Sequence, residues 1–216
     1  MSRLWNAIIL VNLILSLVLC VTWFAMPAAD TDPPPGNMPT TDPPSPWIKA
    51  DLPLGDVAVP VEFQRFTHLT FKAPITGRVT GPAATPVATV LSSLYCQAQG
   101  GPKEQWISHF LDSPAAREDL VVNPSDEQWQ ARCELAKEVG VSILGLIRYD
   151  NYTIVPIKYT WPQKEIAWPP DETFGGFPTV ERDGKHYMDI DAYRKLAPLL
   201  KWLSENEYSM LTKNGE

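Results

Sequence analysis

The sequence predicts an α+β protein: an N-terminal transmembrane helix, then helices packed on an antiparallel sheet, with a helix at the C-terminus. Three observations support this prediction. The chain opens with a long apolar run without charges, and apolar residues between 86 and 136 recur at helical spacing. From Val141 the apolar period falls from 3.6 to two, and two hairpin signals follow.

The N-terminal run from Leu4 to Ala29 carries no charged side chain. A helix needs about 20 apolar residues to cross a hydrocarbon core of about 30 Å, so we expect residues 4–26 to span a membrane. Arg3 precedes the run, whereas Asp30 and Asp32 follow it. The positive-inside tendency therefore places the short end in the cytoplasm and the rest of the chain in the periplasm or otherwise outside the cytoplasm. We expect a single-pass protein of the inner membrane.

A cleaved signal peptide is the main alternative for this segment. Its apolar region is usually about 7 to 15 residues long and ends in an A-x-A arrangement. Here Trp23 and Phe24 extend the apolar run, and no good A-x-A pair follows. Cys20 suggests a lipoprotein, but Leu19 precedes it where a lipid-attachment signal has a small residue. We therefore expect residues 1–29 to remain as a membrane anchor.

Residues 30–55 are predicted to be a proline-rich linker, which leaves residues 56–216 as the exported α+β domain. Such a linker cannot bury enough apolar surface to fold, and it extends by about 3 Å per residue. The remaining length corresponds to one domain with its own core. The prolines are concentrated in the first part of the linker, at Pro33, Pro34, Pro35, Pro39, Pro43, Pro44 and Pro46.

Charge and cysteine content narrow the choice of partners and compartment. The chain has 18 basic and 25 acidic residues, a net charge of -7, which argues against a nucleic-acid partner. Cys20 lies in the predicted anchor, leaving Cys96 and Cys133 in an oxidising compartment. We predict a disulfide between these two residues, although the helical wheel places Cys96 opposite the apolar stripe of its helix.

The first part of the domain combines strand and helix signals. Residues 57–72 alternate loosely and predict one strand or two short ones, with Pro60 suited to an edge. Thr85 followed by Pro86 is a start signal for a helix over 86–98. Two shorter helices are expected to follow, over 103–111 and, capped by Ser113, over 114–120.

A better-marked helix follows them. Ser125 and Gln128 form a capping-box pattern, and Gly140 suits a helix ending in the left-handed region.

Two hairpins and a helix are predicted for the rest of the chain. Asp150 and Asn151 separate two apolar runs and predict a type I′ turn, with the first strand central and the second at an edge or bulge because of Pro156. A second hairpin is expected around residues 183–184. The last helix is predicted over 192–208, capped by Asp191 and bent at Pro198.

The order of these elements, together with the segment FPTVERDGKHYMD, resembles the SnoaL-like or NTF2-like α+β family over residues 86–191. The resemblance implies that packed helices close a cone against a curved antiparallel sheet, with a pocket between them. An exported domain of this kind behind a single anchor also resembles a scaffold component of type IV secretion systems. The fold alone implies no reaction.

The sequence contains no catalytic or metal-binding motif, so we expect no catalytic residue, no metal and no cofactor. The three histidines, His68, His109 and His186, are far apart in the chain. His186 and Asp189 are a candidate base and orienting acid, but odd spacing on a strand sends two side chains to opposite faces. We interpret His186 as a surface residue beside a turn.

Four aromatic residues are the candidate partner-binding site. They lie between residues 161 and 178, on a loop rich in proline and glycine, and are Trp161, Trp168, Phe174 and Phe177. Long loops and aromatic side chains are both common in binding sites. The alternative is that these rings fold back over the sheet as a small separate core.

The resulting functional hypothesis is a non-catalytic, membrane-anchored extracytoplasmic binding or scaffolding domain with a protein partner in the cell envelope. Two alternatives remain: an immunity-type protein that neutralises an exported toxin, and an NTF2-like enzyme or small-ligand carrier.

Overall fold

The computed structural model describes residues 45–122, 124–161 and 174–212, all within one compact unit, Pro39–Glu216. The predicted anchor from Leu4 to Ala29 lies outside these residues. Within the described ranges, no helix is both long and apolar enough to cross a membrane.

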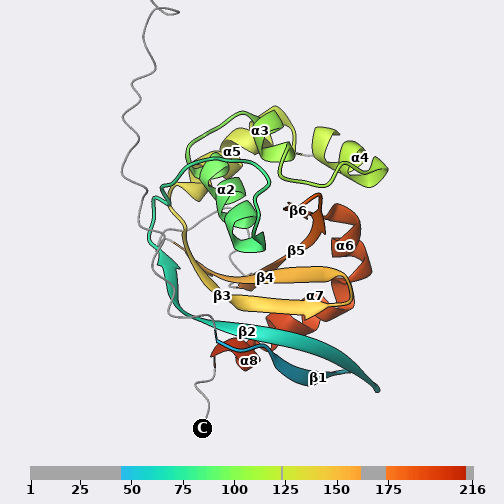
Figure 1. Cartoon of the computed structure of the whole chain (residues 1–216). Helices are drawn as coiled ribbons and strands as arrows, with labels where there is room; N and C mark the ends of the chain where they lie inside the picture. Colours follow the sequence, from blue (N-terminus) through green and yellow to red (C-terminus); the bar gives the residue numbers. More distant parts are fainter. Residues whose placement is uncertain (1–44, 123, 162–173, 213–216) are drawn as a thin grey trace, which may run out of the picture. The chain divides into compact units, whose positions relative to one another are not determined.

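The described residues confirm a mixed α+β fold built on a six-stranded antiparallel sheet (Figure 1). The strands lie side by side in chain order, and a helical segment is inserted between the second and the third. The strands are β1 (Ile48–Leu54), β2 (Val57–Phe71), β3 (Gly140–Tyr149), β4 (Tyr152–Thr160), β5 (Phe174–Arg182) and β6 (Lys185–Met188).

Strand β1 changes the predicted boundary of the linker, which was expected to run to residue 55. Residues 48–54 instead pair with β2 and form an edge of the sheet. Pro53 lies opposite Ala58, and Pro60 lies opposite Asp51. In an antiparallel ladder, pairs of opposite residues alternate between hydrogen-bonded and non-hydrogen-bonded. The two proline pairs are two positions apart and so are of the same type. In a non-hydrogen-bonded pair neither residue donates its N–H to the other strand, so proline is tolerated there. Both prolines are thus compatible with strand pairing.

The predicted strand at residues 57–72 is confirmed as one long strand. Pro60 lies in its first part, where β2 pairs only with β1; pairing with β3 begins at Glu62. Strand β3 is an inner strand as predicted. The register between β3 and β4 shifts between Ile143 and Ile147, and Pro156 of β4 lies opposite this shift, which confirms the predicted bulge.

The helical segment contains α2 (Pro86–Ala98), α3 (Lys103–Ile107), α4 (Pro114–Val122) and α5 (Asp126–Ala136). The predicted caps are present: Thr85 accepts from the N–H of Ala88, and Ser125 and Gln128 form the capping box. Helix α3 is shorter than predicted. Gly140 does not end a helix in the left-handed region; it is the first residue of β3, close to the backbone of Phe71.

Both predicted hairpins form, with different turns. Asp183 and Gly184 have φ values of 52° and 72°, as a type I′ turn requires. At the first hairpin only Asp150 has a positive φ, 56°, so the expected type I′ turn is absent there although Tyr149 still pairs with Tyr152.

The single C-terminal helix of the prediction is three helices, α6 (Ile190–Lys195), α7 (Ala197–Glu205) and α8 (Ser209–Thr212). The cap of α6 is Asp189 and not Asp191: its carboxylate accepts from the N–H groups of Asp191 and Ala192. Pro198 does more than bend the helix. It lies in the first turn of α7, where a missing N–H costs nothing, so the chain stops and restarts at Leu196.

The sheet separates two apolar cores. One lies against α2–α5 and includes Ile143 and Ile157; the other lies against α6–α8 and includes Ile147 and Ile154. Ile143 and Ile147 face opposite cores despite their even spacing because the bulge inserts one extra residue between them. Figure 1 shows α2 and α5 on one side of the sheet and α7 and α8 on the other.

Candidate functional site

An apolar pocket of about 660 Å³ lies between α2, α4, α5 and α6 and the first face of the sheet. Its wall is mainly aromatic and aliphatic. The lining residues are Ile75, Leu94, Gln97, Trp106, Phe110, Asp119, Leu120, Arg132, Leu135, Ala136, Val139, Val141, Tyr159, Trp161, Phe177, Ile190 and Tyr193.

An aromatic cluster holds the helical side of this pocket in place. The ring of Trp106 lies 4.9 Å from that of Phe110 and 5.0 Å from that of Trp129. The indole N–H of Trp129 donates to the carbonyl of Gly101, at 3.1 Å. These contacts join α3 to α5, so Trp106 and Phe110 form a fixed part of the wall.

Within the described part of the chain, two charged side chains line the pocket, Asp119 and Arg132. The carboxylate of Asp119 on α4 accepts from Arg194 on α6, with 2.7 Å between the two atoms. This ion pair is partly exposed, and pairs of this kind stabilise by only about 0–1 kcal/mol, so its role is to join the two helices. Arg132 on α5 is half-buried; burial lowers the pKa of its guanidinium, which nevertheless stays charged at neutral pH.

Tyr159 and Tyr193 add phenol groups to the wall. Burial raises the pKa of Tyr193 well above its ordinary value, so the group remains neutral and can still donate a hydrogen bond. The ring of Tyr193 meets that of Phe177 edge-on at 6.4 Å, and the ring of Tyr159 lies 5.4 Å from that of Trp161.

The four predicted binding aromatics do not form one group. Trp161 and Phe177 both line the pocket. Phe174 lies on the opposite face of β5, where its ring packs 6.2 Å from that of Tyr208 in the second core. Trp168 lies outside the described residues.

Phe174 and Phe177 also belong to strand β5 and not to a loop as predicted. Three positions apart on a strand, they point to opposite faces. The misleading signal is the pair Gly175 and Gly176, which in isolation resemble loop residues. A Cβ at Gly176 would lie 2.5 Å from the hydroxyl of Tyr208, so this glycine allows α7 and α8 to pack closely on the strand.

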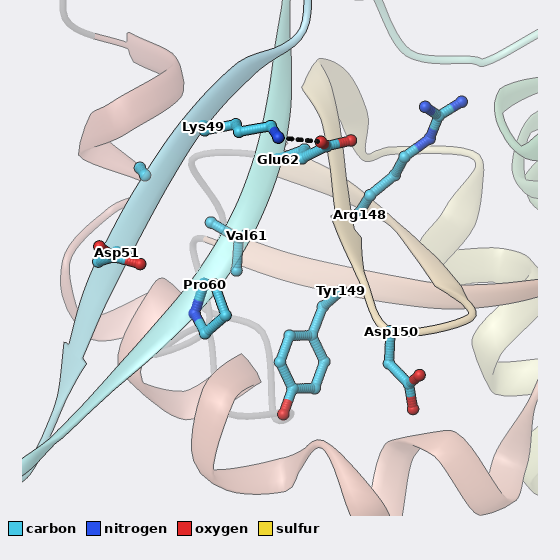
Figure 2. A pocket seen from close by; sticks show the side chains of 9 residues that line it. Lys49, Asp51, Pro60, Val61, Glu62, Arg148, Tyr149 and Asp150 are labelled. Carbon is cyan, nitrogen blue, oxygen red and sulfur yellow. Dashed lines mark ion pairs between the residues drawn. The ribbon is translucent and has the colours of Figure 1, made fainter.

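A second hollow, of about 480 Å³, lies where the β1–β2 ribbon separates from the tip of the β3–β4 hairpin (Figure 2). Its lining is largely charged, and four of its five charged side chains have contacts within the described part of the protein, Asp51 being the exception. The ammonium of Lys49 lies 3.8 Å from the carboxylate of Glu62, and Arg148 stacks at 3.8 Å on the ring of Trp47. Asp150 is paired with Lys195, at 3.3 Å. We therefore regard the apolar pocket as the better candidate site.

One pair of side chains has the geometry of a nucleophile and its base. The Nε2 atom of His109 lies 2.8 Å from the hydroxyl of Ser92, and its Nδ1–H donates to the carbonyls of Gln105 and Trp106. The hydroxyl of Ser92 also accepts from the N–H groups of Thr80 and Gly81. Both side chains are essentially inaccessible, at 1% and 0% exposure, so we interpret the pair as a structural link.

The sequence contains no motif that predicts this pair. Ser92 lies on α2 and His109 follows α3, and their separation of 17 residues is not a catalytic signature. His186 and Asp189, the pair that the sequence suggested, do not form a dyad, because the carboxylate of Asp189 caps α6. The side chain of His68 lies outside the described part. Among the described residues, no group of three or more His, Cys, Asp or Glu side chains is arranged to hold a metal ion.

Cys96 and Cys133 are both buried and both free thiols in the structure. Burial, with a smaller contribution from the charge of Cys133, raises the pKa of Cys96 to about 11. The two residues lie on α2 and α5, which pack against each other. The disulfide between them stays a prediction.

Comparison with known protein families, with curated proteins and with solved structures finds no match for this chain.

Proposed function

We propose that the chain is a membrane-anchored extracytoplasmic binding domain, and that its binding site is the pocket between α2–α5 and the sheet. The observation that carries this proposal is the pocket itself: about 660 Å³ of space with a largely aromatic and aliphatic wall. Ligand pockets in proteins usually measure about 300–1,000 Å³ and combine an apolar lining with a few polar groups. Burying an apolar group there is favourable by about 25 cal/mol per Å² of surface removed from water.

The proposal includes an NTF2-like arrangement, in which helices close a cone against a curved sheet. Helices α2–α5 on one sheet face, with a pocket beneath them, support it. Helices α7 and α8 on the other face depart from a simple two-layer cone. The proposal also includes insertion of residues 4–26 in the inner membrane and a protein partner in the envelope, which rest on the sequence.

Ligand binding by the full-length chain tests the proposal, with a neutral aromatic probe and a variant that fills the pocket. Ala136 on α5 lines the pocket and is half-buried, whereas Ala131 on the same helix is exposed and lies outside it. In lipid nanodiscs, naphthaleneacetamide is expected to quench tryptophan fluorescence saturably, because Trp106 and Trp161 line the pocket.

The variant Ala136→Trp should abolish this quenching, and Ala131→Trp should leave it unchanged. Because a large side chain at residue 136 can also disturb folding, Ala136→Phe and thermal unfolding of each variant are needed as well. Binding that survives in folded pocket-filling variants would refute the proposed site, as would failure of the unaltered chain to bind either this probe or naphthaleneacetate.

A further inference from the structure

We infer that the ligand of this pocket is a small organic anion, with an apolar or aromatic body against the ring-lined wall and an oxyanion bound by Arg132. This inference rests on the proposed function, since it specifies the ligand of the same site.

The first argument is the arrangement of charge around the pocket. Among the described residues that line it, Asp119 and Arg132 are charged, and they come from different helices, α4 and α5. The negative charge of Asp119 is neutralised by Arg194, which approaches to 2.7 Å. The carboxylate of Asp119 is thus held by a cation, and the guanidinium of Arg132, which also has contacts within the protein, is a lining group that can attract an anion.

The second argument is the chemistry of the guanidinium. Arginine presents five N–H donors in a planar fork, which matches the two oxygens of a carboxylate, sulfonate or phosphate. Five donors allow Arg132 to bind a ligand oxyanion while it keeps contacts with the protein. The side chain is half-buried, and ion pairs at such positions are less screened by water than those on an open surface.

The third argument is the nature of the remaining wall. Two ring pairs, Tyr159 with Trp161 and Phe177 with Tyr193, line the same hollow and offer faces and edges to a flat or branched apolar body. Gln97 adds a neutral amide. A ligand with one oxyanion and a hydrocarbon body satisfies both parts of this lining, whereas a sugar or a polycation would leave the aromatic wall without a matching surface.

A matched pair of probes tests the inference: naphthaleneacetate, which is an anion, and naphthaleneacetamide, its neutral isostere. Binding of each to the full-length chain in nanodiscs is measured by tryptophan quenching, with empty nanodiscs as the blank. Because hydrogen bonds to charged groups are stronger than neutral ones, the acetate should bind about tenfold or more tightly than the amide.

The variants are Arg132→Gln, Arg132→Lys and, as a control, Arg117→Gln. Arg117 is an exposed arginine of α4 that pairs with Asp112 and does not line the pocket. Arg132→Gln should weaken the acetate about tenfold, leave the amide unchanged and so remove the preference. Arg132→Lys should show part of the preference for the acetate, and Arg117→Gln should show the full preference.

The outcomes separate the inference from the proposed function. Equal binding of the two probes to the unaltered chain, or a preference that survives in folded Arg132→Gln, overturns the inference while the pocket remains a binding site. A preference that is lost equally in Arg117→Gln overturns it too, since a general surface charge effect would then explain the data. Failure of both probes to bind overturns the proposed function itself.

Discussion

Replacing Gly176 by alanine is expected to destabilise the domain, and replacing Tyr208 by phenylalanine is expected to relieve much of that loss. An alanine Cβ at residue 176 would lie 2.5 Å from the hydroxyl oxygen of Tyr208, well inside van der Waals contact. Its next neighbours, methyl groups of Leu200 and Ile154, would be 3.1 and 3.2 Å away. Tyr208 is 1% exposed, so the hydroxyl cannot move out to water.

Overpacking of this kind costs typically about 1–3 kcal/mol. For a domain of this size, 1 kcal/mol corresponds to a melting temperature lower by about 2–4 °C. In the described part of the chain the hydroxyl of Tyr208 has no hydrogen-bond partner, so Tyr208→Phe alone should be neutral or stabilising. The Tyr208→Phe variant lacks the hydroxyl oxygen that a Cβ at residue 176 would approach most closely. Gly176→Ala should therefore cost about 1 kcal/mol less in this variant, a coupling energy within the usual range for residues in contact.

Chemical denaturation of the four proteins of this double-mutant cycle measures the coupling. Gly175→Ala is the matched control, because its new methyl would meet the ring of Tyr159 and not Tyr208. Its effect should be the same with and without Tyr208→Phe. An equal cost of Gly176→Ala in both backgrounds would refute the claim that β5 packs beneath Tyr208, and with it the placement of Phe177 in the pocket wall.

Three further predictions concern pH, redox state and topology. Burial lowers the pKa of His109 in the folded state, whereas the unfolded state keeps the ordinary value of about 6.5. Below that pH the unfolded state therefore binds more protons than the folded state. The free energy of unfolding should be constant above that pH and fall below it, by at most about 1.4 kcal/mol per pH unit. Urea denaturation across this range should show a shallower fall for His109→Gln, with the remainder due in part to His186, whose pKa burial also lowers. Mass spectrometry after alkylation without reduction should find Cys96 and Cys133 joined when the chain is exported, whereas two alkylated thiols would contradict the disulfide. A reporter that is active only outside the cytoplasm, fused after Glu216, should be active and membrane-bound; a soluble exported product would instead indicate a cleaved signal peptide.

Local sequence signals predicted most of the elements because their physical causes are local. Thr85 and Ser125 accept from backbone N–H groups within their own first helical turn, and Asp183 with Gly184 forms a tight turn without distant help. The bulge at Pro156 was also predictable, since a proline cannot donate within a ladder and a bulge frees it from doing so.

The errors arose where distant contacts decide. Residues 48–54 look like linker in isolation and become a strand only because β2 supplies a partner. Gly176 resembles a loop glycine until Tyr208 packs against it. For the site, sequence reasoning named Trp161 and Phe177 but had no signal for Arg132 or Tyr193, which reach the same pocket from helices far apart in the chain.

Hydrogen exchange of the full-length chain with and without naphthaleneacetate tests the central claim most directly, because it reports where the ligand acts. We expect slower exchange in α2, α5 and β5, which line the apolar pocket, and no change in the β1–β2 ribbon beside the second hollow. Slower exchange confined to β1 and β2, or binding without any change in α5 and β5, would contradict the assignment of the pocket as the binding site.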